Sequence, residues 1–421
     1  MDTIEVEGGV PLRGSFPVSG SKNAALPILA AALLVEGECR LLGVPQLRDV
    51  ATMVKLLRVL GCAVERNADG SITTAVHDAS SVEAPYEIVK EMRASFCVLG
   101  PLVARRGMAR VSLPGGCNLG VRPIDLHLKG LAALGASLEF EAGYVVAKGP
   151  IRGDEMFLQG PFGSTVLGTA NVMMAAALAP GATVIEGAAC EPEVADLARF
   201  LVACGARIDG IGSPRLAVEG VERLQGTTWR VIPDRMEVGT FLVGAALTDG
   251  DVTAEGADPG HLGAVLEVLR RMGARVQRSN GNLRVIGRER LEPVDITTLP
   301  YPGFPTDLQA QFTAALAVAD GLSVVTEKIY PERFMHVAEL GRMGAIIRKE
   351  GPSSIIQGVR RLSGAPVMSS ELRGGAALIL AGLAARGTTT VHRVYHVDRG
   401  YEGIETKLQA LGARVRRVPD E

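Results

Sequence analysis

Two kinds of hydrophobic pattern alternate along the chain. Alanine-rich segments such as NAALPILAAALLV and AAALAPGATVIEG are apolar nearly all round, which predicts helices buried inside a domain. Segments such as RDVATMVKLLRVLG and PGHLGAVLEVLRRMG have one apolar face, which predicts helices that cover the outside of a sheet. A glycine and a strand-like run follow each kind of segment, so we expect a helix, a glycine C-cap and a strand each time.

This order of elements recurs six times. The glycines that end the two kinds of helix form two series, each with a period of about 70 residues. One series is Gly61, Gly135, Gly205, Gly273, Gly344 and Gly412, and the other is Gly37, Gly107, Gly181, Gly250, Gly321 and Gly387. Helix, glycine and strand also alternate in unrelated α/β proteins, but two series with one period favour six copies of one α/β unit.

Length and composition narrow the class of protein. A chain of 421 residues exceeds one ordinary core, so we expect two domains with three units each. The net charge of −2 includes no basic excess, which argues against a nucleic-acid partner. The N-terminus lacks the parts of a signal peptide, and the apolar run of 13 residues after Lys22 is shorter than the ~20 that cross a bilayer. We therefore expect a cytoplasmic protein without membrane insertion.

The cysteines and histidines indicate neither a metal site nor a cofactor site. The six cysteines lie in the first half of the chain without metal-ligand spacing, which is typical of reduced thiols in a cytoplasm. We expect His127, His336 and His396 to be structural, because no catalytic Ser-His-Asp order accompanies them. The chain has no phosphate-binding P-loop and no GxGxxG, so no nucleotide cofactor is expected.

Polar residues stand at the start of every alanine-rich helix. They are Lys22, Asn23, Arg93, Ser164, Thr165, Arg235, Asp307 and Arg373. Helix N-termini offer free N–H groups to phosphate or carboxylate, so these residues predict an anion-binding region if the helices converge. Ordinary N-caps at Ser21, Ser164, Thr306 and Ser370 are the alternative explanation. The arginines need anionic partners, which are either a ligand or the neighbouring Asp234 and Glu371.

A loop cysteine gives the clearest chemical signal. Cys117 lies in PGGCNLGVRPIDLH, where the glycines and prolines predict a turn and Arg122 follows five residues later. A thiol beside a cation can act as an acid or a nucleophile, and a buried free thiol is the other interpretation. Arg333 and Arg399 lie on further loops. A cleft with these cations and Asp307 would suit an anionic substrate pair, a general base and a general acid.

Several long stretches resemble the UDP-N-acetylglucosamine 1-carboxyvinyltransferase family. They are SGSKNAALPILAAALL, MRASFCVLGPLVARRG, LPGGCNLGVRPIDLHLKGLAALGA, IPDRMEVGTF, YPGFPTDLQAQF, ERFMHVAELGRMGA and VYHVDRGYEGIETKLQALGA. The resemblance implies a two-lobed inside-out α/β barrel built from six copies of one βαβαββ-type unit. It places residues 22–231 in one lobe and residues 1–21 with 232–421 in the other, with the active site between them.

The resemblance also implies a reaction. The family transfers the enolpyruvyl group of phosphoenolpyruvate to the 3-hydroxyl of UDP-N-acetylglucosamine, by addition and then elimination of phosphate. This is the first committed step of peptidoglycan synthesis, and it uses no metal and no cofactor. Cys117 resembles the proton donor and the thiol that fosfomycin attacks, and Asp307 resembles the base.

The remaining site residues follow from the same resemblance. They are expected to bind phosphoenolpyruvate or the nucleotide sugar: Lys22, Asn23, Arg93, Arg122, Pro123, Ile124, Asp125, Leu126, Ser164, Thr165, Ile329, Arg333, Arg373 and Arg399. Lys22, Asn23 and Arg399 are also expected to take part in catalysis. Closure of the cysteine loop would exclude water from the reactive intermediate.

One segment departs from the family pattern. Where the family has a lysine that binds the diphosphate, this chain has Gly163 in GPFGSTVLGTANVMM, and Ser164, Thr165 and backbone N–H groups would replace part of that contact. The departure makes another nucleotide the closer alternative acceptor. Shikimate 3-phosphate, the acceptor of a relative with the same fold, is a second alternative, and the cysteine loop and the RPIDL segment argue against it. A non-catalytic nucleotide-sugar-binding paralogue is the third alternative, and it conflicts with the presence of Cys117, Asp307, Lys22 and Arg399.

Overall fold

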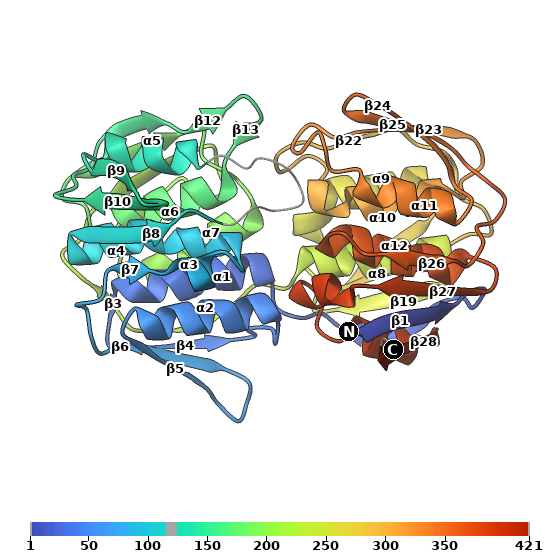
Figure 1. Cartoon of the computed structure of the whole chain (residues 1–421), viewed down its shortest axis with the longest axis horizontal. Coiled ribbons are helices and arrows are strands. Elements are labelled where there is room, and N and C mark those ends of the chain that lie inside the picture. The colour runs from blue at the N-terminus through green and yellow to red at the C-terminus, as the bar shows by residue number, and fades with distance from the viewer. Residues whose placement is uncertain (1, 115–123, 420–421) are drawn as a thin grey trace. The chain divides into compact units, whose positions relative to one another are not determined.

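The chain divides into two compact units. The computed structural model describes residues 2–114 and 124–419 (Figure 1). In these residues, the N-terminal unit comprises residues 20–114 and 124–232, and the C-terminal unit comprises residues 2–19 and 233–419. The chain therefore starts in the C-terminal unit, crosses once after Ser19 and returns after Ile232.

Buried helices form the interior of each unit. The N-terminal unit has α1 (Lys22–Ala31), α4 (Leu99–Arg106) and α6 (Val166–Ala176) inside, and the C-terminal unit has α8 (Arg235–Leu247), α10 (Gln309–Leu316) and α12 (Leu372–Ala384). Short 3-10 turns, η2 (Arg93–Val98) and η4 (Thr306–Leu308), precede α4 and α10. The alanines and glycines of the interior helices allow these helices to pack closely. At Gly100 of α4, for example, an added Cβ would lie 2.2 Å from the carbonyl oxygen of Asn171.

Amphipathic helices cover the outside of both units. They are α2 (Arg48–Val59), α5 (Asp125–Ala133), α7 (Pro192–Ala203), α9 (Gly263–Arg271), α11 (Met335–Arg342) and α13 (Ile404–Ala410). In α9, for example, Val265 and Leu269 are buried, whereas Arg270 is exposed. The remaining short turns are α3 (Tyr86–Val89), η1 (Ala32–Leu34), η3 (Pro259–Leu262) and η5 (Val394–Arg399).

Three four-stranded sheets surround the helices in the described part of the N-terminal unit. In spatial order, the first is β18 (Thr228–Arg230), β4 (Glu38–Leu42), β6 (Ile72–Val76) and β5 (Cys62–Arg66). The second is β7 (Glu83–Ala84), β8 (Met108–Ser112), β10 (Tyr144–Lys148) and β9 (Ser137–Glu141). The third is β11 (Glu155–Phe157), β14 (Ala182–Glu186), β16 (Arg215–Glu219) and β15 (Arg207–Asp209).

The described part of the C-terminal unit repeats this arrangement. Its first sheet is β2 (Arg13–Pro17), β19 (Asp251–Glu255), β21 (Asn282–Ile286) and β20 (Arg275–Ser279). The second is β22 (Ile296–Thr297), β23 (Leu322–Thr326), β25 (Ser353–Gln357) and β24 (Ile346–Glu350). The third is β26 (Pro366–Met368), β27 (Thr388–His392), β1 (Asp2–Glu7) and β28 (Arg414–Pro419).

All six sheets share one pairing pattern. The first and second strands are parallel, and the second, third and fourth are antiparallel. In the sixth sheet the N-terminal strand β1 pairs with the C-terminal strand β28, so the two ends of the chain complete one unit. The predicted α/β architecture of six repeats is confirmed by this pattern.

The two glycine series mark turns that need a left-handed backbone. All six glycines that end the amphipathic helices have positive φ, from +79° at Gly61 to +107° at Gly205. In the other series Gly250 is the exception, because Asp249 takes the positive φ there. Gly250 is still required, since a Cβ would lie 2.3 Å from the carbonyl oxygen of Leu12.

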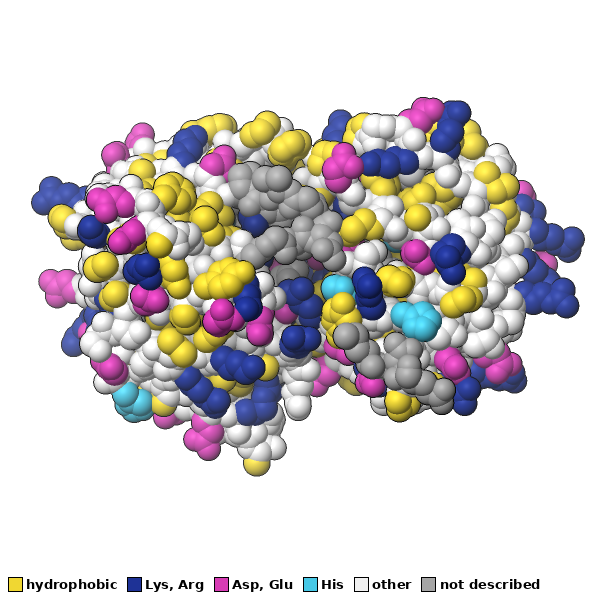
Figure 2. Space-filling model, viewed as in Figure 1, with side chains coloured by type: hydrophobic (Ala, Val, Ile, Leu, Met, Phe, Trp, Pro, Cys, Tyr) yellow, Lys and Arg dark blue, Asp and Glu magenta, His cyan; other side chains and the backbone are white. Residues whose placement is uncertain are grey.

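The surface carries both signs of charge. Lys and Arg side chains alternate with Asp and Glu side chains over the visible face of each unit (Figure 2). Many belong to exposed ion pairs along the sheets, such as Arg284 with Asp251 and Arg207 with Glu219. Within the described residues, none of the helices has the length and the apolar character needed to span a bilayer.

Candidate active site

The predicted site residues are shared between the two units, and some are not described. Cys117, Arg122 and Pro123 lie outside the described residues. The N-terminal unit carries Lys22, Asn23, Arg93, Ile124, Asp125, Leu126, Ser164 and Thr165, and the C-terminal unit carries Asp307, Ile329, Arg333, Arg373 and Arg399.

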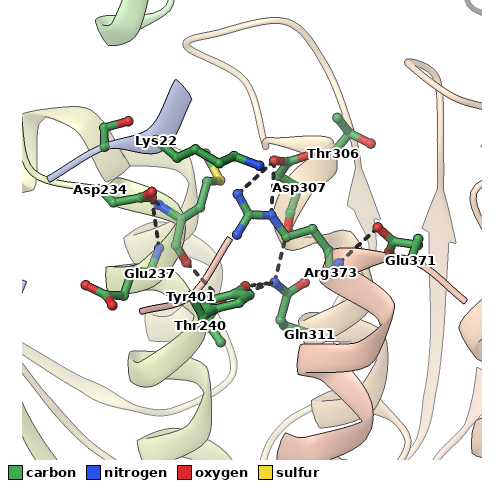
Figure 3. Close-up of polar contacts among 12 residues, drawn as sticks. Lys22, Asp234, Glu237, Thr240, Thr306, Asp307, Gln311, Glu371, Arg373 and Tyr401 are labelled. Atoms are coloured by element: carbon green, nitrogen blue, oxygen red, sulfur yellow. Dashed lines mark hydrogen bonds and ion pairs between the residues drawn. The ribbon is translucent and has the colours of Figure 1, made fainter. Parts of the chain in front are cut away.

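Asp307 lies between two buried arginines in the C-terminal unit. Its Oδ1 accepts a hydrogen bond from Arg333 Nη1 at 2.7 Å. Its Oδ2 accepts one from Arg373 Nε at 3.1 Å, and Figure 3 shows this contact. Asp307 comes from η4, Arg333 from the loop before α11, and Arg373 from the first turn of α12. The Asp307 side chain is 28% exposed, whereas those of Arg333 and Arg373 are 4% and 2% exposed. The carboxylate is therefore held in one orientation and remains accessible.

Glu371 is the second carboxylate of this cluster. It caps α12 by accepting hydrogen bonds from the backbone N–H groups of Arg373, at 2.9 Å, and Gly374. Its Oε2 also lies 3.3 Å from Arg333 Nη2. Burial would raise the pKa of Glu371, but the Arg333 guanidinium and the two N–H groups lower it below its usual value. Glu371 is thus a buried anion that balances one of the two arginines.

The charges of the two arginines are kept by their carboxylate neighbours. Burial alone would lower the pKa of the Arg333 guanidinium, but Glu371 and Asp307 raise it above the ordinary arginine value. Burial alone would also lower the pKa of Arg373, but Tyr401 and Asp307 raise it above the ordinary arginine value. His336, at the start of α11, is neutral at pH 7, because burial and Arg333 lower its pKa to about 4.

A neutral hydrogen-bond network supports Asp307 from below. Gln311 Nε2 donates to the backbone carbonyl of Asp307 at 3.0 Å, and it lies 3.1 Å from Thr240 Oγ1 and 3.2 Å from the hydroxyl of Tyr401 (Figure 3). The Arg373 guanidinium lies 5.2 Å from the centre of the Tyr401 ring. The network joins α8, α10 and the segment after η5, so it fixes the start of α10 relative to the other interior helices.

Glu327 organises the other side of Asp307. It is fully buried and accepts hydrogen bonds from the hydroxyls of Thr298, at 2.6 Å, and Thr306, at 2.9 Å. It also accepts from the backbone N–H of Ile329 at 2.8 Å. The half-buried Ile329 is therefore held in the same cluster as Thr306, next to Asp307. Arg399 ends η5, two residues before Tyr401.

Lys22 begins the first interior helix of the N-terminal unit. Ser21 caps α1, with its Oγ accepting the backbone N–H of Ala24 at 3.3 Å. The Lys22 ammonium lies 3.2 Å from Asp49 Oδ2, and both residues are buried. Asn23 is half-buried beside it. The N-cap predicted at Ser21 is confirmed.

Arg93 stands at the start of η2 above a neutral buried network. Asn171 Nδ2 donates to the carbonyl of Phe96 at 3.1 Å and lies 3.1 Å from His127 Nδ1, while its Oδ1 accepts the N–H of Gly100 at 2.6 Å. Burial and the Arg93 charge lower the pKa of His127 to about 3, so this histidine is neutral at pH 7.

His127 belongs to α5, the helix that carries two of the predicted uridine-loop residues. Asp125 and Leu126 form its first two positions, and Ile124 is its N-cap residue. The interactions of His127 with Asn171 fix this helix against α4 and α6.

The segment with the missing lysine forms a tight hairpin. β12 (Gln159–Gly160) pairs with β13 (Gly163–Ser164), and Gly160 lies opposite Gly163. Gly163 has φ +94°, a conformation that glycine adopts and lysine does not readily adopt. Thr165 then caps α6 by accepting the N–H of Gly168 at 3.2 Å.

Three of the predicted N-caps are wrong. The cap of α6 is Thr165 rather than Ser164, and the cap of α12 is Glu371 rather than Ser370. Thr306 lies inside η4 and donates its hydroxyl hydrogen to Glu327 instead. At α8, Asp234 is the cap, accepting from the N–H groups of Met236 and Glu237.

Comparisons with known proteins identify the family of the chain. The model of the EPSP synthase (3-phosphoshikimate 1-carboxyvinyltransferase) family matches residues 6–408. A UDP-N-acetylglucosamine 1-carboxyvinyltransferase from Anaeromyxobacter sp. (strain Fw109-5) is 56% identical, over 99% of both chains. One of the same name from Methylacidiphilum infernorum is 52% identical, over 99% of both chains.

The chain belongs to the UDP-N-acetylglucosamine 1-carboxyvinyltransferase family. Two solved structures have the same fold as this chain. The enolpyruvyl transferase NikO from Streptomyces tendae has a TM-score of 0.90 at 24% identity, covering 100% of this chain and 99% of the other. The EPSP synthase from Acinetobacter baumannii has a TM-score of 0.75 at 21% identity, covering 100% of both chains. The predicted two-lobed inside-out α/β fold is therefore confirmed.

The sequence pattern misses several residues that shape the cluster around Asp307. The sequence singles out Glu371 only as a neighbour of Arg373, and it gives no signal for Glu327, Gln311 or Tyr401. Each has a partner far away in the chain, such as Arg333 for Glu371, Thr306 for Glu327 and Tyr401 for Gln311, so no local pattern announces these contacts. The ELRGG stretch carried the one usable signal, because an acidic residue directly before a helix is a common N-cap.

Proposed function

We propose that this chain transfers the enolpyruvyl group of phosphoenolpyruvate to the 3-hydroxyl of UDP-N-acetylglucosamine and releases phosphate. The observation that carries the proposal is the 52–56% identity, over nearly the whole of both chains, to enzymes named for this activity. The cluster around Asp307 supports it, because a held and accessible carboxylate suits a base for a hydroxyl group. This reaction opens peptidoglycan synthesis, and the cytoplasm is its proposed location.

Asp307 is proposed as the base in the addition step. The sugar hydroxyl transfers its proton to the carboxylate while its oxygen bonds to C2 of phosphoenolpyruvate. Each Asp307 oxygen accepts from one arginine and keeps further lone-pair capacity for this proton. Arg333 and Arg373 keep the carboxylate oriented, which lowers the reorganisation needed in the transition state.

Cys117 is proposed as the acid in the same step. Its thiol gives a proton to the C3 methylene, which becomes a methyl group in the tetrahedral intermediate. In the elimination step the methyl group loses a proton, the bond from C2 to the phosphate oxygen breaks, and phosphate leaves. Lys22, Asn23, Arg122 and Arg399 are proposed to bind the phosphate and carboxylate groups, and Arg93 the nucleotide sugar.

One specific feature favours a second candidate acceptor. The tight turn at Gly163 holds no lysine, and its backbone conformation disfavours one. Another nucleotide, bound with less dependence on a diphosphate cation, is therefore the second candidate. Ser164 and the N-cap Thr165 are the nearest polar groups that the segment offers to a diphosphate.

The test is phosphate release from phosphoenolpyruvate with three acceptors: UDP-N-acetylglucosamine, UMP and shikimate 3-phosphate. We expect release with the first, and we expect fosfomycin to abolish it. Cys117→Ala should lose most of this activity, whereas Cys117→Asp should keep turnover and resist fosfomycin. Release with UMP or shikimate 3-phosphate alone would contradict the proposed acceptor, and no release with any of them would contradict the transferase itself.

A further inference from the structure

A buried carboxylate outside the predicted site contacts the end of the N-terminal unit, just before the chain returns to the C-terminal unit after Ile232. Asp196 lies on α7 of the N-terminal unit and is 1% exposed. Its Oδ1 accepts the indole N–H of Trp229 at 3.2 Å, and its Oδ2 accepts the backbone N–H of Ile232 at 3.3 Å. Neither partner belongs to the site described above, and most of the other residues of α7 are buried as well.

The contact with Ile232 leads directly to Lys22. The carbonyl of Ile232 accepts the backbone N–H of Ser21 at 2.7 Å. Ser21 in turn caps α1, and Lys22 is the first residue of that helix. One short chain of hydrogen bonds therefore runs from Asp196 through Ile232 and Ser21 to the helix start that carries Lys22.

A neutral side chain could not hold both donors at this position. A carboxylate offers an acceptor on each oxygen, whereas an asparagine offers one acceptor and one donor. Burying an ionised group is costly, and a residue kept only for packing would not need it. The charge at position 196 is therefore explained by the two N–H groups that it satisfies.

The surroundings of Asp196 raise its pKa toward neutral pH. Burial raises its pKa to about 6, although the bonds from Ile232 and Trp229 lower it. The charged groups that act on it are Arg199 and Glu193, both on α7. Of the helices packed on α7, α6 has no titratable side chain, and α1 has only Lys22, which is paired with Asp49. The strand β15 also packs on α7, and its charged residues Arg207 and Asp209 are exposed.

We propose that Asp196 is a positioning residue that fixes the start of α1, and through it Lys22, for binding of phosphoenolpyruvate. The proposal rests on the proposed function for the role of Lys22. Protonation or replacement of Asp196 removes an acceptor, which loosens Ile232 and then the first turn of α1. The expected effect is weaker binding of phosphoenolpyruvate and little change in the chemical step.

Hydrogen exchange tests the positioning without any assay of activity. In the full chain, Asp196→Asn should increase the amide exchange rate of residues 21–24 about tenfold over wild type at pH 7.5. The matched control is Asp209→Asn, an exposed aspartate of the same unit on β15, which should leave these amides unchanged. Equal exchange at residues 21–24 in the two variants would overturn the proposal.

The single tryptophan of the chain gives a second readout. Trp229 donates to Asp196, so its fluorescence should titrate with a midpoint near pH 6 in wild type. The titration should be absent from Asp196→Asn and present in Asp209→Asn. A titration that persists in Asp196→Asn would show that another group causes it and would overturn the assignment. This measurement also serves if Asp196→Asn fails to fold, because a wild type without the transition contradicts the proposal.

Kinetics connects the positioning to function. Asp196→Asn should raise the KM for phosphoenolpyruvate about tenfold and change kcat less than threefold, while Trp229→Phe, which leaves the Ile232 contact intact, should change neither by more than twofold. A tenfold loss of kcat with no change in KM would contradict a positioning role. If wild type shows no transfer at all, the proposed function fails, and the exchange experiment still decides whether Asp196 holds the start of α1.

Discussion

The two units bury different polar groups between their second and third interior helices. In the C-terminal unit, the starts of α10 and α12 meet in a network of charges, with Asp307 and Glu371 balancing Arg333 and Arg373. In the N-terminal unit, the corresponding space between α4 and α6 holds a neutral network around Asn171 and His127.

The two networks differ in whether their buried groups need counter-ions. Hydrogen bonds alone satisfy Asn171, its backbone partners and a neutral His127, so that network needs no counter-ion. A buried pair of guanidinium groups must keep its carboxylates, because removal of one leaves an uncompensated charge. A protein retains such an arrangement most readily where charge serves the chemistry, which agrees with the proposed role of Asp307.

Removal of Glu371 should have the largest effect on stability. Glu371→Ala leaves Arg333 with Asp307 as its one carboxylate partner in the described cluster and removes the cap of α12, so we expect a loss of about 3–5 kcal/mol in the free energy of unfolding. Urea unfolding of the full chain at pH 7 measures it. A loss below about 1 kcal/mol would show that the charges do not depend on one another.

The pH dependence of this effect sharpens the prediction. Because the pKa of Glu371 is lowered in the folded chain, its stabilising contribution is present above its unfolded pKa of about 4.3 and is lost as the pH falls further. The difference in stability between wild type and Glu371→Gln should therefore be larger at pH 7 than at pH 3.5. The same difference at both values would contradict the assignment.

His127→Gln tests the neutral network with a smaller effect. The pKa of His127 is lowered to about 3, so the unfolded chain takes up the proton first and stability declines as the pH falls below about 6.5. Between pH 7 and pH 5 this group should cost wild type about 2 kcal/mol, and a glutamine that keeps the contact with Asn171 should not show that loss. Exposed His77→Gln is the control within the same unit, and a pH dependence unchanged in His127→Gln would contradict the prediction.

The exposed pair of Arg284 and Asp251 should matter least. Arg284 Nε lies 2.6 Å from Asp251 Oδ1 across β19 and β21, and both side chains are partly in solvent. Arg284→Gln should lower the free energy of unfolding far less than Glu371→Ala does, because solvent screens the exposed pair, and the effect should vanish in 1 M salt. An effect as large as that of Glu371→Ala would remove the distinction between the exposed and the buried charges.

The fold was predictable because each repeat carries local sequence signals, above all a glycine at the end of each helix. Glycine at a helix end reports a left-handed backbone, and the structure has that conformation at all six glycines of one series. Gly250 shows the limit of the argument, because Asp249 makes the turn and Gly250 is needed for the close approach of Leu12. The pairing of β1 with β28 had no local signal, and the resemblance implied only that residues 1–21 belong to the second lobe.

The site was predictable only in part. Asp307 and Arg373 stood out because a charged residue opens each helix, and the structure brings the two together at 3.1 Å. The caps at Ser164 and Ser370 failed because a neighbouring residue, Thr165 or Glu371, was equally able to cap and the helix start decides between them. The roles of Cys117 and Arg122 stay predictions, since both lie outside the described residues.

The most direct test of the central claim compares two aspartates of the C-terminal unit. Asp307→Asn should lower kcat for phosphate release with UDP-N-acetylglucosamine by about 10²–10⁴-fold, because an amide cannot take the hydroxyl proton. Asp295→Asn, an exposed residue that accepts the N–H of Val324, should keep wild-type kcat. A kcat for Asp307→Asn within about threefold of the control would contradict the account, because the carboxylate between the two arginines would then not be the base.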